Sequence, residues 1–365
     1  MNNSEILLKI IQDNHYKHIN KVESIINKDR KDATYKLALL RAFCDISEKD
    51  FNNVIWRTDK VGVPVELIVE NWILYYWSIF ESSDFIPQKN GEKESTGKKI
   101  AFRNELTEFI HSYKSNGGLN SFYNDLKNNN IQCIDIYSKL KTKVRNAIIK
   151  GPVFYAGGFA NEKPFSYDKD TKCITMDREL WIEISVLNHF IKESLLIRWA
   201  EFTSHLSGFK YQPGFILNKL LVSPVIERDV VQAKKTYSNV VDLRCVWTGN
   251  AFKKGFDVDH VIPYSLWKNN DLWNLIPVRS DVNRRKSDKL PTNRLIKECK
   301  DRIVYCWKLL DKNNHIRFLR EVNRFNGDLR SKQLLDNWEN ITFNNLVNSI
   351  EYTAQQRGWE RWEPN

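Results

Sequence analysis

The stretch FDVDH (256–260), followed by NLIPV (274–278) and NRRKSD (283–288), decides how the C-terminal third of this chain folds. The first run holds the apolar Phe256 and Val258 and ends in an Asp-His pair, as expected of a short strand. The second run is apolar, and the third is basic and predicts a helix. The order strand, loop, strand, helix therefore predicts a small ββα unit.

The polar residues of this unit suit phosphodiester chemistry. Mg²⁺ prefers oxygen ligands and keeps several waters, so Asp259 and Asn283 suffice to hold it, with Mn²⁺ as the expected substitute. His260 is the natural base, because the pKa of an unperturbed imidazole lies near neutrality. We expect Asn274 to tie the loop 263–273 back to the strands and to hold the His260 ring.

Charged neighbours surround this set in the sequence. Asp257 shares a strand face with Asp259, and it is either a third metal ligand or, as alternation alone favours, a residue that orients a neighbour or is solvated. Five basic residues are expected to contact phosphates rather than to read bases: Arg279, Arg284, Arg285, Lys286 and Lys289.

These motifs resemble those of the HNH (ββα-metal) endonuclease superfamily, and most closely the HNH domain of the type II CRISPR effector nucleases. The shared pattern stands here as CVWTG (245–249), DVDH (257–260), PYS (263–265), Asn274 and RSDVNRRKSD (279–288). The resemblance implies that His260 is the general base and Asn274 the structural asparagine. It also implies that Asp259 and Asn283 bind Mg²⁺, and that DNA is cut to leave 5′-phosphate and 3′-hydroxyl ends. Nothing outside 240–291 resembles such effectors.

The rest of the chain reads as mostly helical. An aromatic stripe at helical spacing follows Pro64 over residues 65–80, and we expect it to be core rather than a base-stacking platform. Residues 165–176 predict a short hairpin, and one long helix is expected from its N-cap Asp177 to Gly208. Further helices are expected within 1–85, 101–150, 214–237, 301–325 and 331–357, with an exposed loop over 87–99.

The predicted fold is therefore mainly α, or α+β overall, with a helical body and a small ββα-metal HNH nuclease domain near the C-terminal third. Four segments are predicted: a helical N-terminal region (1–150), a hairpin plus long helices (151–239), the nuclease domain (240–300) and C-terminal helices (301–365). The terminal Trp359 and Trp362 either stack on bases or dock onto the body.

Composition narrows the partners. Lys and Arg number 56 against 45 Asp and Glu, a net charge of +11 that favours a polyanion, nucleic acid first, although a Lys-rich proteome would also explain it. The sequence has no signal peptide and no apolar run long enough for a membrane span, so we expect a cytoplasmic protein. Six cysteines without CxxC spacing predict reduced thiols and no structural zinc.

The sequence thus predicts a cytoplasmic, Mg²⁺-dependent endonuclease that cuts DNA in phage defence or restriction. One such site cuts one strand, so double-strand cleavage requires a homodimer or two successive nicks. Two other interpretations stay open: an effector subunit recruited and activated by a partner protein or guide complex, and a DNA-binding module without catalysis.

Overall fold

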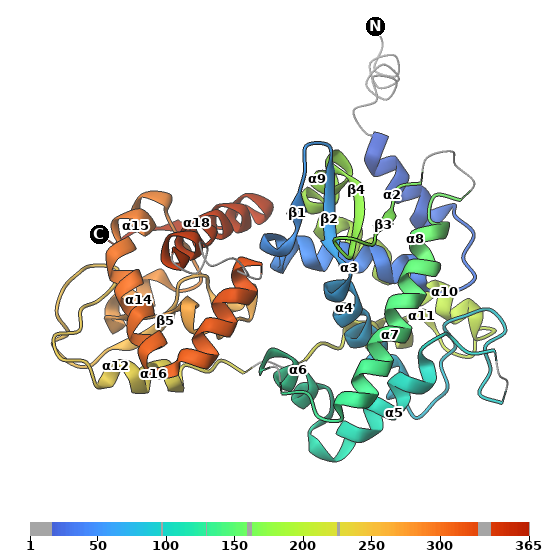
Figure 1. The fold of residues 1–365 in the computed structure, drawn as a ribbon, viewed down its shortest axis with the longest axis horizontal. Helices are drawn as coiled ribbons and strands as arrows, with labels where there is room; N and C mark the ends of the chain where they lie inside the picture. The colour runs from blue at the N-terminus through green and yellow to red at the C-terminus, as the bar shows by residue number, and fades with distance from the viewer. Residues whose placement is uncertain are drawn as a thin grey trace, which may run out of the picture. The chain divides into compact units, whose positions relative to one another are not determined.

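The computed structural model describes residues 17–364 except 96–97, 129, 159–162, 225–226 and 328–336. The chain forms two compact units, Met1–Val225 and Ile226–Asn365, and each has its own hydrophobic core (Figure 1). Helices dominate both units and the sheets are small, so the predicted fold class is confirmed. The finer division into four segments stays a prediction.

The first unit is a helical body with one four-stranded sheet. Its α-helices are α2 (Lys17–Asn27), α3 (Tyr35–Lys49), α4 (Val65–Phe80), α5 (Arg103–Tyr113), α6 (Gly118–Asn128), α7 (Ile134–Lys150), α8 (Pro152–Tyr155), α9 (Arg178–Val186), α10 (Asn188–Leu206) and α11 (Pro213–Leu221). Its sheet has the order β1-β2-β4-β3 and consists of β1 (Ile55–Trp56), β2 (Lys60–Pro64), β3 (Ser166–Asp168) and β4 (Cys173–Asp177).

The sheet both confirms and corrects the sequence prediction. The hairpin expected over 165–176 is present as β3 and β4. The prediction of helix throughout residues 1–85 is wrong at β1 and β2. For β2 the reason is that it pairs antiparallel with the distant β4, for example Val63 with Ile174, and a pairing partner so far away leaves no local pattern. Strand β1 in turn pairs with β2.

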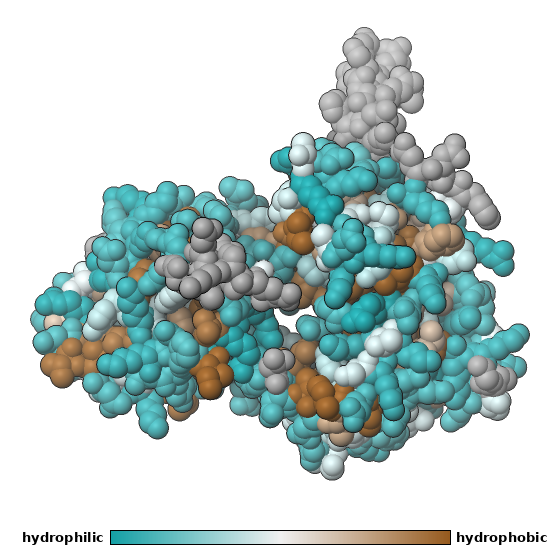
Figure 2. Space-filling model, in the orientation of Figure 1, coloured by the Kyte–Doolittle hydropathy of each residue, from teal (hydrophilic) through white to brown (hydrophobic). Residues whose placement is uncertain are grey.

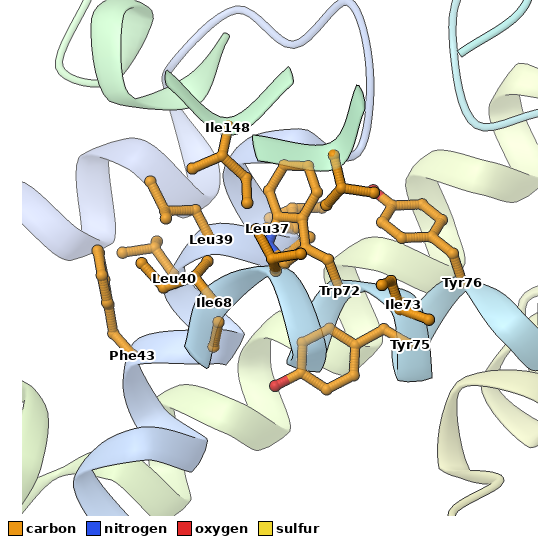
Figure 3. Packing of buried hydrophobic residues seen from close by; sticks show 14 of the residues in the cluster. Leu37, Leu39, Leu40, Phe43, Ile68, Trp72, Ile73, Tyr75, Tyr76 and Ile148 are labelled. Carbon is orange, nitrogen blue, oxygen red and sulfur yellow. The ribbon is translucent and has the colours of Figure 1, made fainter. Parts of the chain in front are cut away.

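The aromatic stripe of α4 is core, as predicted. The side chains of Trp72, Tyr76 and Trp77 are fully buried, and Trp72 stacks on Tyr35 with ring centroids 5.3 Å apart. Figure 3 shows side chains of α3 and α4 meeting in this core together with Ile148 of α7. A helix that is apolar on most of its faces is expected to be largely buried, and 11 of the 16 residues of α4 are buried.

The long helix predicted from Asp177 to Gly208 is instead two helices, α9 and α10, which meet at Leu187. The side-chain amide of the buried Asn188 donates to the carbonyl oxygen of Ser185 at 3.0 Å, and such local bonds compete with helical backbone bonds. Likewise, the helix expected over 214–237 is interrupted between α11 and α12 (Val231–Ser238).

The second unit contains the predicted ββα motif. Strands β5 (Asp257–His260) and β6 (Leu275–Val278) pair antiparallel, with Asp259 opposite Ile276, and α14 (Ser280–Lys286) follows. The remaining elements are α13 (Tyr264–Trp267), η3 (Leu272–Asn274), β7 (Leu290–Pro291), α15 (Asn293–Glu298), α16 (Lys300–Asn326), α18 (Trp338–Arg357) and β8 (Arg361–Trp362). The helix expected over 301–325 is present as α16, which is kinked at Asn314 (φ −142°, ψ 40°). The first residues of the helix expected over 331–357 lie outside the described residues.

The C-terminal residues dock onto this unit. Strand β8 pairs in parallel with β7, and the buried Trp362 meets Trp247 edge-to-face at 6.0 Å between ring centroids. Of the two interpretations of Trp362, docking therefore fits the structure.

One face of the surface can be described from its hydropathy. On the face drawn in Figure 2, hydrophilic residues prevail and apolar patches are separate. No helix in the described part of the chain has the length and apolar character needed to cross a membrane. The six cysteines are free thiols, and only Cys133 is exposed.

The core of the first unit generates a stability prediction. Trp77 is 0% exposed and stacks on Phe122 at 5.1 Å, so Trp77→Ala should lower the free energy of unfolding by about 3–5 kcal/mol. Phe190, 69% exposed, is the control: Phe190→Ala should change it by no more than about 0.5 kcal/mol. Guanidinium unfolding followed by circular dichroism measures both, and equal losses would contradict this account of the core.

Candidate active site

Four of the predicted site residues, Asp259, His260, Asn283 and Arg284, line one cavity of about 520 Å³ in the second unit. Strand β5 contributes Asp259 and His260, and α14 contributes Asn283. Because β5, β6 and α14 are adjacent, side chains far apart in the sequence converge there. The lining consists of Arg228, Asp259, His260, Pro263, Tyr264, Ser265, Lys268, Asn283, Arg284, Ser287 and Asp288.

A buried lysine holds the Asp259 carboxylate. Nζ of Lys286, whose side chain is 0% exposed, lies 3.1 Å from Asp259 Oδ2 and donates to the carbonyl oxygen of His260 at 2.8 Å. The indole Nε1 of Trp247 donates to the same Oδ2 at 3.2 Å. Both contacts use Oδ2, and no donor among the described residues reaches Oδ1. The second carboxylate oxygen is therefore left for a ligand.

Asn283 is oriented by Asp257. Its Nδ2 donates to Asp257 Oδ2 at 3.1 Å, so the amide oxygen is the atom left for other contacts. Of the two interpretations of Asp257, the residue that orients a neighbour fits this bond. One carboxylate oxygen and one amide oxygen form a hard donor set that suits Mg²⁺ or Mn²⁺. Among the described residues no group of three or more His, Cys, Asp or Glu could hold a metal ion, so water and substrate oxygens would have to complete the coordination.

Asn274 is buried behind the cavity and fixes the loop after β5. Its Oδ1 accepts from the amide of Ile262 at 2.8 Å, and its Nδ2 donates to the carbonyl oxygen of Ile262 at 3.0 Å. Its own carbonyl oxygen accepts from the amide of Val261 at 2.8 Å. These bonds fix the backbone of the two residues that follow His260, while the predicted role of Asn274 in tying the loop 263–273 to the strands and holding the His260 ring stays a prediction.

The imidazole of His260 is buried, and only one of its two ring nitrogens has a hydrogen-bond partner among the described residues. Its Nε2 lies 3.2 Å from Oδ1 of Asn270, while Nδ1 is buried without a hydrogen-bond partner among the described residues. Burial lowers the pKa of His260 to about 4, and the bond to Asn270 opposes this shift. The ring is therefore neutral near pH 7, the form in which an imidazole accepts a proton.

The five basic residues predicted to contact phosphates lie in different surroundings. Arg284 lines the cavity, whereas Lys286 is buried against Asp259. Arg279 makes two 3.0 Å bonds to Asp281, Arg285 lies 3.4 Å from the same carboxylate, and Lys289 lies 2.6 Å from Glu360.

Two exposed basic side chains that line the cavity, those of Arg228 and Lys268, were not predicted from the sequence. Arg228 lies well before the motif, and no local pattern marks it. Asn270 and Trp247 were missed as partners of the site, although Trp247 stands inside the quoted CVWTG lead-in.

Residues 15–220, more than half of the chain, match the family described as a domain of unknown function (DUF8808). The chain belongs to this family. Residues 246–292 match the HNH endonuclease family, and this match covers Asp259, His260, Asn274 and Asn283. No solved structure matches the chain. The DUF8808 match lies within the first unit and the HNH match within the second, so the predicted HNH domain is confirmed, while its closer likeness to type II CRISPR effectors stays a prediction.

Helix α16 supports the loop of the HNH domain that carries Asn270. Arg317 donates to the carbonyl oxygen of Asn270 at 3.1 Å and to Glu321 Oε1 at 2.7 Å. The other carboxylate oxygen of Glu321 accepts from the amide of Leu272 at 2.6 Å. Burial raises the pKa of Glu321 to about 7, with a smaller contribution from Asp271, and the Arg317 guanidinium only partly opposes this.

The buried Lys286–Asp259 pair generates a test of stability. Lys286→Met should lower the free energy of unfolding by about 3–5 kcal/mol, because it leaves a buried carboxylate without its counter-charge. Adding Asp259→Asn should restore part of the loss. Lys289→Met is the control, since Lys289 and its partner Glu360 are partly exposed, and it should cost no more than about 1 kcal/mol. Urea unfolding in EDTA measures all four proteins, and equal effects of the two lysine variants would contradict the role of Lys286.

Glu321 should make the free energy of unfolding depend on pH. Its pKa rises from 4.5 to about 7 on folding, so the folded protein binds more protons than the unfolded chain between these values. The contribution of Glu321 to the free energy of unfolding should therefore fall as pH rises from 4.5 to 7, by on the order of 3 kcal/mol, while His260, whose pKa is lowered on folding, contributes in the opposite direction over much of this range. Glu321→Gln should remove that fall, and denaturant unfolding between pH 4.5 and 8 measures it. Parallel curves for variant and wild type would refute the assignment.

Proposed function

We propose that this protein is an Mg²⁺-dependent endonuclease that hydrolyses phosphodiester bonds of DNA. The observation that carries the proposal is one cavity lined by an imidazole, a carboxylate and a side-chain amide, those of His260, Asp259 and Asn283. A hard divalent cation and a base are what hydrolysis of a phosphodiester by water requires.

Each residue has a distinct part in this reaction. His260 accepts the proton of the attacking water, and Asn274 keeps the backbone after His260 in place. Asp259 and Asn283 hold the cation, which when bound stabilises the charge on the phosphate and on the leaving 3′-oxygen. Lys286 compensates the carboxylate charge of Asp259 from the side away from solvent.

Cations on the cavity favour a polyanionic substrate. Arg228, Lys268 and Arg284 line it, and Ile226–Asn365 carries 25 Lys and Arg against 18 Asp and Glu. Arginine and lysine bind phosphates without reading sequence, so these residues position the backbone of DNA. We include Arg279, Arg285 and Lys289 among the DNA contacts as well, at the cost of their present ion pairs.

The biological role we propose is phage defence or restriction in a prokaryotic cytoplasm, by analogy with other HNH enzymes that carry an additional helical body. The six free cysteines fit a reducing compartment. One HNH site cuts one strand, so cleavage of both strands takes a homodimer or two nicks.

A second candidate function is a nuclease subunit recruited and activated by a partner protein or guide complex. The observation that favours it is the separate first unit, which has its own core and belongs to its own family. A purified chain that nicks DNA only after the product of a neighbouring gene is added would support this candidate over the stand-alone enzyme.

Plasmid nicking tests the activity. Wild type should nick supercoiled DNA in Mg²⁺ or Mn²⁺ and not in EDTA, and His260→Ala should lower the rate by about 10²–10⁴-fold, the usual contribution of a general base. His315→Ala is the control, because its side chain is 66% exposed on α16 outside the cavity, and it should retain the wild-type rate.

Two outcomes would overturn the proposal. Equal rates for wild type and His260→Ala would remove His260 from catalysis. Binding of DNA without nicking in any divalent cation, with or without a partner protein, would instead support the interpretation that the protein is a DNA-binding module without catalysis.

A further inference from the structure

We infer that Asn270 is a positioning residue that fixes the tautomer of His260 and thereby selects Nδ1 as the atom that accepts the proton. The part about proton acceptance rests on the proposed function, whereas the tautomer follows from hydrogen bonds alone. Asn270 lies in the loop between the two strands of the ββα motif, outside the residues that line the cavity.

The orientation of the Asn270 amide is fixed by two backbone groups whose roles cannot change. Its Nδ2 lies 2.7 Å from the carbonyl oxygen of Glu227, which can only accept. Its Oδ1 lies 3.1 Å from the amide nitrogen of Asp229, which can only donate. A flipped amide would set two donors against each other at one end and two acceptors at the other, so the oxygen is the atom that faces His260.

The amide oxygen in turn decides the protonation of the ring. Oδ1 of Asn270 carries no hydrogen, so Nε2 of His260, at 3.2 Å, must be the donor. A neutral imidazole with hydrogen on Nε2 has its lone pair on Nδ1. Nδ1 is the ring nitrogen that has no hydrogen-bond partner among the described residues, so no protein group occupies its lone pair.

Asn270 is itself held from two directions. The amide of Val231 donates to Asp229 Oδ1 at 2.9 Å, so the segment 227–229 is anchored at the start of α12. On the other side, Arg317 of α16 donates to the carbonyl oxygen of Asn270 at 3.1 Å. Asn270 thus lies between the segment that leads into the second unit and a long helix, and it has little freedom to follow a moving ring.

A matched set of variants separates this role from a merely structural one. Asn270→Ala removes the acceptor, and Asn270→Asp keeps an oxygen that faces His260. Asn269→Ala is the control in the same loop, because Asn269 bonds to Asp271, at 2.8 and 2.9 Å, and not to His260.

The tautomer is read from the ¹⁵N chemical shifts of the His260 ring in the full-length chain, labelled at histidine, at pH 8 without metal or DNA. The His260→Ala spectrum identifies its signals among the seven histidines. We expect the Nε2–H form in wild type, Asn270→Asp and Asn269→Ala, and a mixture of both forms in Asn270→Ala.

Nicking under single-turnover conditions is the second readout. Asn270→Ala should lower the maximal rate by about 10–100-fold, as loss of an orienting partner usually does, with little change in the DNA concentration at half-maximal rate. Asn269→Ala should stay within about twofold of wild type, and Asn270→Asp should recover part of the loss.

Three results would overturn the inference: an Nδ1–H ring in wild type, an unchanged ring in a folded Asn270→Ala, or an equal loss of rate in Asn269→Ala. Failure of the proposed function is distinguishable, since an inactive wild type would still report its ring tautomer.

Discussion

The candidate site depends on one buried ammonium group. Nζ of Lys286 reaches both the Asp259 carboxylate and the carbonyl oxygen of His260, so a single side chain ties α14 to the end of β5. Taking these charges out of water is costly, and the cost is met only when the pair is well aligned and further hydrogen bonds complete it. Trp247 supplies such a bond to the same carboxylate oxygen. The arrangement fixes the direction in which the second carboxylate oxygen of Asp259 points. The protein's own contacts therefore position this side chain.

Around this pair, polar groups of loops are satisfied by side chains rather than by sheet partners. Asn274 bonds both polar backbone groups of Ile262, and Glu321 accepts the amide of Leu272. A two-stranded sheet has too few ladder bonds to fix a loop of this length, and buried backbone groups left unpaired would be costly. The side chains of Asn274 and Glu321 therefore supply the hydrogen bonds to the loop backbone that further strands supply in larger sheets. Burying ionised Glu321 costs free energy, and for this reason its pKa is raised. The hydrogen bonds that order the loop offset this cost.

How much of this could be predicted from sequence depends on the range of the contacts. The ββα motif was predictable because β5, β6 and α14 follow one another and each has its own local pattern. The pairing of β2 with β4 was not, since a short strand gives no sign of a distant partner. Within the site, the types of the residues could be predicted from the sequence, but their burial could not. Lys286 and Arg284 are two positions apart, yet Lys286 is buried and Arg284 lines the cavity. Which of two neighbouring cations is buried depends on the helix face, and Arg228 reaches the cavity from outside the motif altogether.

The division of the chain bears on how a target could be chosen. Contacts from Arg228, Lys268 and Arg284 to phosphates would fix the backbone of DNA but carry no sequence information. The cavity itself offers a carboxylate, an amide and an imidazole, which we propose to be occupied by the cation and the reacting water. Discrimination between targets therefore has to come from groups outside the cavity. The first unit has a hydrophobic core of its own and matches a separate family. We therefore propose that Met1–Val225 supplies target selection or partner binding.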